Sequence, residues 1–596
     1  MRLQGLSIKG WRGRLLVVDL SQRLFKTVEL SSRLLKAYIG GRGLGVKIVY
    51  DHTPRRVDAY HPDVPLIFAV GPLTATPFYS TARFCVISKS PLTGTLFDSS
   101  CGGELGLELK KAGFDALMVK GSSKSLVSLV IDDEDFLIKD AEGLRGYTTK
   151  ATREALRKDY GEEFKVACIG PAGENMVRMA SINSDEGHVA GRGGLGAVMG
   201  AKGLKALVVR GSKPLEVADE KGIRELNRLV LKRIKSNPIT GKALPGLGTL
   251  FLLQVVNEHG MLPSRNFKNT SFDEAYKISA ELFKAKLFKR RKGCFNCPIA
   301  CKRVVNLKGE EHPQPEFETT WALGALCEVA SPEALVELNS LCNDLGIDTI
   351  SMGSTLACAM ELSEEGLLDT RVTWGDVEAM KELIADTAHR RGLGRTLAEG
   401  SKKMAERLSR PELSMSVKGL ELPAYDPRGA YGQALAYATS NRGGCHLRAY
   451  MISTELLGVP ILLDRLNPIG KAELVAYYEN FLAAIDSLIV CKFLSLELDD
   501  NIFASALRMA TGGLFTRAEL IKAGERIWNL ERLFNLEEGF TSSHDTLPER
   551  ILSSPGAPPL QAMLEKYYEV RGWNRAGKPI EAKLEELGLP GERITM

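Results

Sequence analysis

The chain has 596 residues, more than one hydrophobic core supports, so two to four domains are expected. Hydrophobic residues make up 44% and charged residues 25%, as in ordinary globular proteins, and a net charge of +5 is too small for a dedicated nucleic-acid-binding protein. Eleven scattered cysteines favour a reducing cytoplasm over a disulfide framework. Met1–Gly5 opens no apolar signal segment, and no apolar run is long enough to predict a membrane span.

Residues 1–211 are predicted to form a β-rich domain. Short apolar, β-branched runs bounded by Gly, Pro and Asp occur at residues 14–20, 64–70, 84–88, 116–120 and 126–131. From 212 to 416 apolar residues recur at helical spacing, which predicts helices near 223–234, 332–342, 350–361, 377–388 and 396–408. Residues 417–596 are again mainly helical. No long linker separates these parts, so we expect an α+β protein whose three domains pack into one body.

Three Gly-rich turns in the β-rich part each carry or face an arginine: residues 40–45 with Arg42, 102–103 with Arg83, and 191–196 with Arg192. Glycine permits positive φ and lets backbone amides approach an anion closely. A guanidinium group matches phosphate oxygens in a two-pronged fork. The three sets together predict a phosphorylated cofactor. None is a dinucleotide-binding fingerprint, and no P-loop is present.

Three cysteines follow at C-x2-C-x3-C spacing: Cys294, Cys297 and Cys301. Structural zinc and a cubane iron–sulfur cluster both need four ligands, so a fourth must come from elsewhere. Cys491, which follows an apolar run with no cysteine nearby, is the best candidate. The third cysteine, Pro298 beside the second, and the lack of a C-x2-C partner downstream favour iron–sulfur over zinc. The basic run before the triplet, 286–292, is either a solvated face or a receptor for an acidic redox protein.

These residues resemble the aldehyde:ferredoxin oxidoreductase family, which uses tungsten and sometimes molybdenum. The resemblance runs nearly end to end and is carried by the cysteine triplet together with segments 40–45, 71–74, 90–94, 190–200, 315–319, 344–348, 425–429, 438–446, 486–491 and 524–532. It implies a β-rich N-terminal base for two pyranopterin dithiolenes, closed over by two helical domains. Four dithiolene sulfurs then hold the metal, and a [4Fe–4S] cluster sits on Cys294, Cys297, Cys301 and Cys491, with magnesium as a further candidate ion.

The resemblance also assigns residues around these cofactors. Phosphates and pterins are expected to be bound by Arg83, Ser100, Gly102, Gly103, Arg192, Gly193, Asp344, Gly346, Asp348, Arg442 and Asp486. Glu318 or Glu316, and His446, match the acidic residue and the histidine beside the metal. The chain departs from the family at Ser100, often Asn, and in 486–491, where the family's D-x-x-G-L-C has lost its glycine. Some family members bridge their subunits through a metal bound by an E-x-x-H pattern. The chain has no convincing E-x-x-H at that place, so no intersubunit metal is expected.

The expected reaction is oxidation of a small aldehyde to a carboxylic acid, with electrons leaving singly to ferredoxin. The metal polarises the carbonyl or supplies an oxygen nucleophile, Glu318 (or Glu316) acts as general base, and His446 orients the carbonyl oxygen or relays a proton. A related reduction of a carboxylate or aromatic acyl thioester is the alternative within enzymes, and a zinc-stabilised binding scaffold is the alternative outside them. A homodimer is expected; nucleic acid and membrane partners are not.

Overall fold

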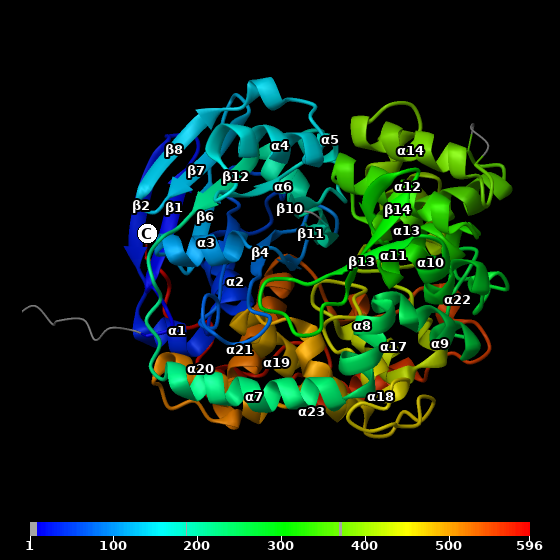
Figure 1. The fold of residues 1–596 in the computed structure, drawn as a ribbon. Helices are drawn as coiled ribbons and strands as arrows, with labels where there is room; N and C mark the ends of the chain where they lie inside the picture. The colour runs from blue at the N-terminus through cyan, green and yellow to red at the C-terminus, as the bar shows by residue number, and fades with distance from the viewer. Residues whose placement is uncertain (1–8, 186, 369–371, 596) are drawn as a thin grey trace, which may run out of the picture.

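The computed structural model describes residues 9–185, 187–368 and 372–595. The expectation for Met1–Gly5 therefore lies outside the described residues. Among the described helices, none is by itself long and apolar enough to cross a membrane, although the pair Ile239–Leu247 and Thr249–Glu258, bent by 101°, meets the length and composition test together. The chain folds into a β-rich N-terminal part and a mainly helical remainder (Figure 1), as the α+β expectation requires. The boundaries at 211 and 416 stay predictions.

Two six-stranded mixed sheets make up the N-terminal part. The first runs in the order β2 (Leu24–Glu29), β1 (Arg14–Asp19), β6 (Ala116–Lys120), β3 (Leu66–Ala69), β4 (Phe84–Lys89), β5 (Leu96–Cys101). The second runs in the order β11 (His188–Ala190), β10 (Ile182–Ser184), β9 (Lys165–Cys168), β12 (Leu204–Arg210), β7 (Val127–Asp132), β8 (Asp135–Asp140). β1 is parallel to β6 and β7 to β12, while the other neighbours are antiparallel. All five predicted strands are present.

Alternation along the strands places each sheet between two apolar layers, because successive side chains point to opposite faces. Leu16 and Phe68 of the first sheet and Leu129 of the second share one buried cluster between the sheets. Val17 and Ile67 point the other way, into a core shared with the helices of residues 471–537. Helices complete these layers: α1 (Ser32–Tyr38), α2 (Gly41–His52), α3 (Leu105–Ala112), α4 (Thr149–Tyr160), α5 (Pro171–Glu174) and α6 (Leu195–Ala201).

The middle part is helical, with a small sheet that the sequence pattern did not predict. Its helices are α7 (Glu220–Ser236), α8 (Leu244–Leu247), α9 (Leu252–Glu258), α10 (Ala280–Lys286), α11 (Phe317–Leu323), α12 (Pro332–Leu345), α13 (Thr349–Glu364), α14 (Val377–His389), α15 (Gly394–Leu397) and α16 (Ser401–Arg407). β13 (Phe288–Lys292), β14 (Lys302–Leu307) and β15 (Glu310–Pro313) form an antiparallel sheet. Residues 288–292 of the basic run 286–292 form this sheet's largely exposed edge strand, and the cysteine loop joins it to β14.

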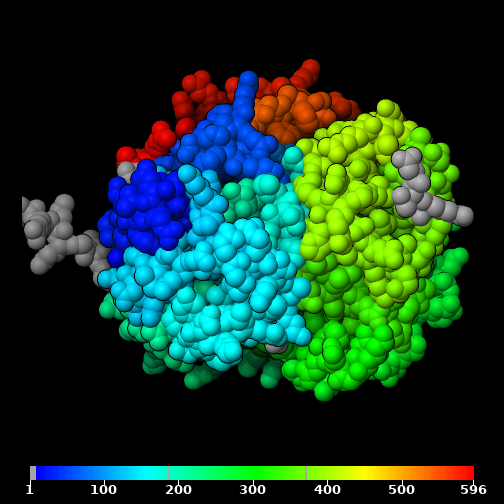
Figure 2. Space-filling view, turned by 90° about the horizontal axis from the view of Figure 1, so that it is seen from above, coloured from blue at the N-terminus to red at the C-terminus, as the bar shows by residue number. Residues whose placement is uncertain are grey.

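The C-terminal part packs beneath the first sheet (Figure 1). It comprises β16 (Ser416–Val417), β17 (Leu420–Glu421), α17 (Tyr431–Thr439), α18 (Ile452–Glu455), α19 (Lys471–Leu488), α20 (Asp500–Thr511), α21 (Arg517–Glu537), α22 (Glu549–Leu552), α23 (Leu560–Arg571) and α24 (Glu581–Leu587). α7 runs along this part and packs on α20. From above, the N-terminal and middle parts meet along a continuous seam (Figure 2). The site lies inside, where all three parts converge.

Candidate active site

One cavity of about 760 Å³ is lined by residues from all three parts of the chain. Its wall includes all four predicted cluster cysteines, both predicted glutamates and His446. Arg83, Ser100, Gly102, Asp344 and Asp348 line it too. The other predicted cofactor residues do not line it: Gly103, Arg192, Gly193, Gly346, Arg442 and Asp486.

The cysteine loop and Cys491 are fastened together through one residue of the N-terminal part. The backbone N–H of Ser80 donates to the carbonyl of Asn296, 3.0 Å away, and the N–H of Cys491 donates to the carbonyl of Ser80, 3.1 Å away. Asn296 and Ala300 both take positive φ, 50° and 48°, which turns the short loop back on itself. Thus thiols far apart in sequence share one cavity wall.

Arg83 lies against these thiols. Burial acts to lower the pKa of its guanidinium, but the negative charge of the Cys491 and Cys294 thiolates outweighs burial and raises that pKa. Burial in turn raises the pKa of Cys491 to about 11, while Arg83 acts in the opposite direction. An arginine beside two thiols can therefore neutralise part of the charge of any centre that they hold.

Glu318 and His446 face one another inside the cavity. Glu318 lies in the first turn of α11, and its Oε1 is 3.5 Å from Nε2 of His446. Burial raises the pKa of Glu318 to about 8, although the backbone N–H of Ala424, 3.0 Å from Oε2, acts to lower it. Burial, followed by the positive charge of Arg192, lowers the pKa of His446 far below its usual value. At neutral pH both groups are therefore uncharged.

Both members of this pair have hydrogen-bonding capacity to spare. Oε1 of Glu318 and Nδ1 of His446 are buried without a hydrogen-bond partner among the described residues. Such unpaired groups are rare in folded proteins, and at a cavity wall they indicate a place for a ligand.

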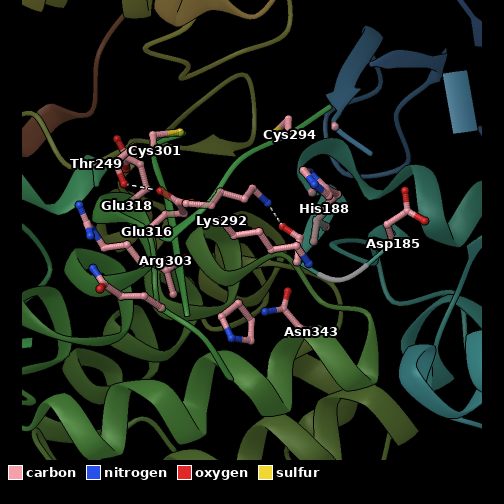
Figure 3. Close-up of a pocket in the computed structure, with 18 of the residues that line it drawn as sticks. Asp185, His188, Thr249, Lys292, Cys294, Cys301, Arg303, Glu316, Glu318 and Asn343 are labelled. Carbon is pink, nitrogen blue, oxygen red and sulfur yellow. Dashed lines mark hydrogen bonds between the residues drawn. The ribbon is translucent and has the colours of Figure 1, made fainter. Parts of the chain in front are cut away.

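Glu316 occupies a different place. It stands at the N-cap position of α11, yet its side chain accepts a hydrogen bond from Oγ1 of Thr249 rather than capping the helix. Its negative charge contributes, after burial, to raising the pKa of Cys301. Figure 3 shows Glu316 and Glu318 on the same side of the cavity as Cys301, with His188 and Asp185 on the other side. The charge of Glu316 thus affects the thiol of Cys301, whereas Glu318 faces His446.

Two tyrosines that sequence reasoning missed complete the surroundings of the pair. The hydroxyls of Tyr425 and Tyr450 are 2.9 Å apart, and both rings pack within 6.0 Å of the His446 ring, centroid to centroid. Phe317 packs on Tyr425 at 5.5 Å. These residues make the cavity around the carboxyl group apolar. Tyr425 lies in segment 425–429, so the resemblance already marked its neighbourhood.

A buried charge cluster lies behind the cavity. Arg42 donates to both carboxylate oxygens of Glu531, at 2.8 Å each, and lies 3.4 Å from Asp486. Arg448 bridges Asp98, at 2.7 Å, and Asp486, at 3.3 Å. Sequence reasoning selected Asp486 and noted Arg42 in a Gly/Arg set, but it missed Arg448, Asp98 and Glu531. Their signal was weak, because isolated charges in helical and strand segments are usually exposed.

The predicted aspartate segments sit at helix ends. Gly346 ends α12 with φ 77°, and Asp348 caps α13 by accepting a hydrogen bond from Ser351 N at 3.1 Å. At the counterpart, α19 ends at Ile489 with φ 60° and ψ 46°. This is the position of the family's missing glycine. The backbone keeps a left-handed turn there, which is strained for a β-branched residue, and the Ile489 side chain packs on Gly41.

The glycines predicted near the cofactors have protein neighbours. A Cβ on Gly102 would meet the His188 ring at 2.2 Å, one on Gly103 would meet Asp185 at 2.5 Å, and one on Gly193 would meet Phe97 at 2.5 Å. Packing by itself therefore accounts for glycine at these three positions.

Arg192 and Arg442 are each held by backbone oxygens. Arg192 donates to the carbonyls of Gly444 and Glu421 at 2.9 and 2.7 Å. Arg442 donates to the carbonyl of Asp98 and to Sγ of Cys445. The Nε atoms of Arg192, Arg442 and Arg448 remain buried without a hydrogen-bond partner among the described residues.

Comparison with known proteins places this architecture in a known class. Sequence models of the aldehyde ferredoxin oxidoreductase family match residues 15–211 (N-terminal domain) and 225–589 (domains 2 and 3). The chain is 42% identical to the tungsten-containing aldehyde ferredoxin oxidoreductase of Pyrococcus furiosus, over 97% of this chain and 98% of that one. The protein of the same name from Thermococcus kodakarensis is 41% identical over 97% and 98%.

A solved structure described as the active-site complex BamBC of benzoyl coenzyme A reductase with 1,5-dienoyl-CoA is similar with a TM-score of 0.86 and 26% identity, covering 98% of this chain and 97% of that one. The chain thus has the fold of a class that includes tungsten-containing oxidoreductases. The chain belongs to the aldehyde ferredoxin oxidoreductase family. Membership implies tungsten and pterin cofactors.

Proposed function

We propose that this enzyme oxidises aldehydes to carboxylic acids at a tungsten centre held by two pyranopterin dithiolenes, and that a [4Fe–4S] cluster passes the electrons to a ferredoxin. The observation that carries the proposal is the single cavity that joins Glu318 and His446 to four cysteine thiols. Oxidation of an aldehyde to a carboxylic acid takes its second oxygen from one water and releases two protons and two electrons. A carboxyl beside an imidazole can transfer the protons, and a thiol-ligated cluster can transfer the electrons.

The residues behind the cavity fit the anionic parts of the pterin cofactors. The buried Nε atoms of Arg442 and Arg448 lack a hydrogen-bond partner among the described residues, and a buried polar atom left unpaired costs about 1–3 kcal/mol. Nε of Arg192 has only the Asp348 carboxylate, 3.5 Å away. Phosphate oxygens are the partners that guanidinium groups bind best. We assign Arg83, Arg192 and Arg442 to the phosphates. The aspartate segments are assigned to the pterin rings, through Asp344, Gly346, Asp348 and Asp486, with Ser100 at the cavity wall.

The four thiols fit a cluster better than a single zinc ion. Among the described residues, no three His, Cys, Asp or Glu side chains come close enough together to hold one metal ion. Zinc requires its four ligands around one point, whereas in a cubane each thiolate binds a different iron. The four thiols line one cavity, and the other three each help to raise the pKa of Cys301, which supports a shared centre; we assign Cys294, Cys297, Cys301 and Cys491 as ligands of the iron–sulfur cluster.

In this assignment the chain's own residues transfer the proton and orient the substrate. The tungsten centre, when bound, would polarise the aldehyde carbonyl and would accept the two electrons. In its ionised form, which is populated as the pH approaches its raised pKa of about 8, Glu318 accepts a proton released during oxidation through the Oε1 that faces the cavity. His446 stays neutral and uses its unpaired Nδ1 to hydrogen-bond the substrate oxygen. Phe317, Tyr425 and Tyr450 make the surroundings of Glu318 and His446 apolar and position the two groups.

The likeness to the benzoyl coenzyme A reductase structure favours a second candidate, reduction of an aromatic acyl thioester. A 30% identical relative named aliphatic sulfonate oxidoreductase, WOR-like subunit, from Pyrococcus furiosus also shows that this architecture is not confined to aldehydes. The aldehyde is favoured because the relatives at 41–42% identity are named for it. The homodimer and the cytoplasmic location stay predictions.

The deciding experiment is metal analysis of the purified enzyme followed by a substrate panel. We expect tungsten, about four iron atoms per chain, and absorbance near 400 nm. Dye-linked oxidation of short and aromatic aldehydes is expected, with no reduction of benzoyl thioesters by the dithionite-reduced enzyme. Thioester reduction without aldehyde oxidation would move the enzyme to the second candidate. A colourless protein that binds zinc would overturn both.

A further inference from the structure

We propose that an acidic ferredoxin docks on the face formed by strand β13 and the cysteine loop, with Phe295 as its central contact. The proposal deepens the function above and rests on it, because it needs an electron-carrying cluster at the four thiols. It concerns residues 288–297, of which the cofactor assignment uses only the cysteines.

The cysteine loop brings two of the assigned cluster ligands next to the surface. Cys294 and Cys297 flank Phe295 and Asn296, both of which are exposed. Electron transfer between proteins weakens steeply with distance, so an acceptor has to dock where these thiols approach the solvent. In Figure 1 the bright green loop that follows β13 lies on the face turned toward the viewer.

Phe295 presents an aromatic ring at this point. It stands between two of the cysteines and is 56% exposed. The next residue fixes the loop, because Nδ2 of Asn296 donates to the carbonyls of Pro77 and Phe78 at 3.0 and 3.3 Å. The ring is therefore held outward on an anchored backbone. Aromatic side chains at rigid, central positions contribute much of the binding energy at protein interfaces.

The strand that leads into the loop gives this face a positive charge. Lys289 and Arg290 both pair with the single carboxylate of Glu311, at 3.1 and 2.8 Å. Arg291 is exposed, and in the described part of the chain its guanidinium makes neither an ion pair nor a hydrogen bond. Arg291 also stands directly opposite Arg303 in the β13–β14 ladder. Like charges opposite one another are unfavourable, so an acidic partner would relieve this repulsion.

An acidic iron–sulfur protein fits these features together. Complexes between redox proteins are small and short-lived, and charge complementarity governs how fast they form. Arg291 at the rim would attract the acidic partner, and the ring of Phe295 near the thiols would set the partner's distance from the cluster. The structure thus provides both parts of a transient electron-transfer interface.

The test compares holoenzyme variants with two electron acceptors, a strongly acidic [4Fe–4S] ferredoxin and a small viologen dye. Arg291→Glu should raise the KM for ferredoxin about tenfold at low ionic strength, and the effect should shrink as salt screens the charges. Phe295→Ala should raise that KM about tenfold at every salt concentration. Turnover with the dye, which needs no docking face, should stay within about twofold of wild type, with unchanged absorbance near 400 nm.

Lys26→Glu is the matched control, because Lys26 is exposed on β2 of the first sheet and its replacement changes the net charge equally. The docking face would be refuted if both test variants kept the wild-type KM for ferredoxin. It would also be refuted if Lys26→Glu raised that KM as much as Arg291→Glu. The dissociation constant of the oxidised complex provides a readout independent of turnover. If wild type oxidises no aldehyde with the dye, the proposed function fails, yet unchanged ferredoxin binding in both variants would still refute the docking face separately.

Discussion

Oε1 of Glu318 lies 3.5 Å from Nε2 of His446, inside a cavity that also holds four cysteine thiols. Neither group is charged at neutral pH, because burial raises the pKa of the carboxyl to about 8 and lowers that of the imidazole. The pair is therefore poised to exchange one proton rather than held as an ion pair. This arrangement distinguishes Glu318, which the sequence favoured as the base, from Glu316, its second candidate.

Glu318→Gln should lower dye-linked turnover by roughly 100-fold or more while tungsten and iron contents stay at wild-type levels, because it removes the proton acceptor and keeps the shape. Glu316→Gln is the matched control on the same helix and should stay within about fivefold. Turnover with aldehyde and viologen, together with metal analysis, measures both. Equal activity of the two variants would exclude Glu318 as the base.

The pH dependence of turnover should follow Glu318. Its pKa is raised to about 8, so the group is protonated below that pH and becomes a base above it. The rate should therefore increase with pH up to about 8 and then level off. No further inflection from His446 is expected between pH 5 and 7, because burial keeps its pKa far lower. In Glu318→Gln the inflection should disappear; if it persists, another group is titrating.

Cys491→Ser should lose most of the absorbance near 400 nm and lower the iron content below the roughly four atoms expected per chain, since serine is a poor ligand for iron–sulfur clusters. Cys168→Ser is the control, because Cys168 is buried in β9, its thiol donates to the carbonyl of Thr149, and it lies outside the cavity. Iron analysis and visible spectra distinguish the two. A fully loaded Cys491→Ser enzyme would contradict the ligand assignment.

Arg192→Ala should lower the tungsten content of the purified enzyme several-fold without lowering its iron content, because it removes a buried guanidinium assigned to phosphate. Arg145→Ala removes an exposed arginine paired only with Glu142 and should change neither metal. Tungsten retention equal to wild type in Arg192→Ala would show that this arginine only joins the N-terminal part to the carbonyls of Gly444 and Glu421.

Gly41→Ala should destabilise the fold by about 1–3 kcal/mol, because overpacking at a tight contact forces the backbone to shift. The new Cβ would meet the Asp486 carbonyl and the Ile489 side chain at 2.6 Å, in a residue with φ 39°. Gly143→Ala, with no atom within 4 Å, is the control and should change the unfolding free energy little. Denaturant unfolding measures both, and equal stability of the two variants would refute the packing argument.

Much of the fold could be predicted because its signals are local. The five β-branched runs form strands, and the periodic segments near residues 332–342, 350–361 and 377–388 form α12, α13 and α14. β13 was missed, because Lys289-Arg290-Arg291-Lys292 has no apolar alternation; pairing with β14, rather than propensity, makes it a strand.

The sequence by itself determined the chemistry available: three cysteines at fixed spacing with a fourth candidate, arginines beside glycine-rich turns, and a histidine and two glutamates in recognisable segments. These are properties of residue type and short spacing. Only the tertiary structure decided which of them meet. Ser80 joins the cysteine loop to Cys491 through the backbone, and one turn of α11 sends Glu318 toward His446 and Glu316 toward Cys301. Such contacts depend on packing between distant segments, which no local pattern encodes.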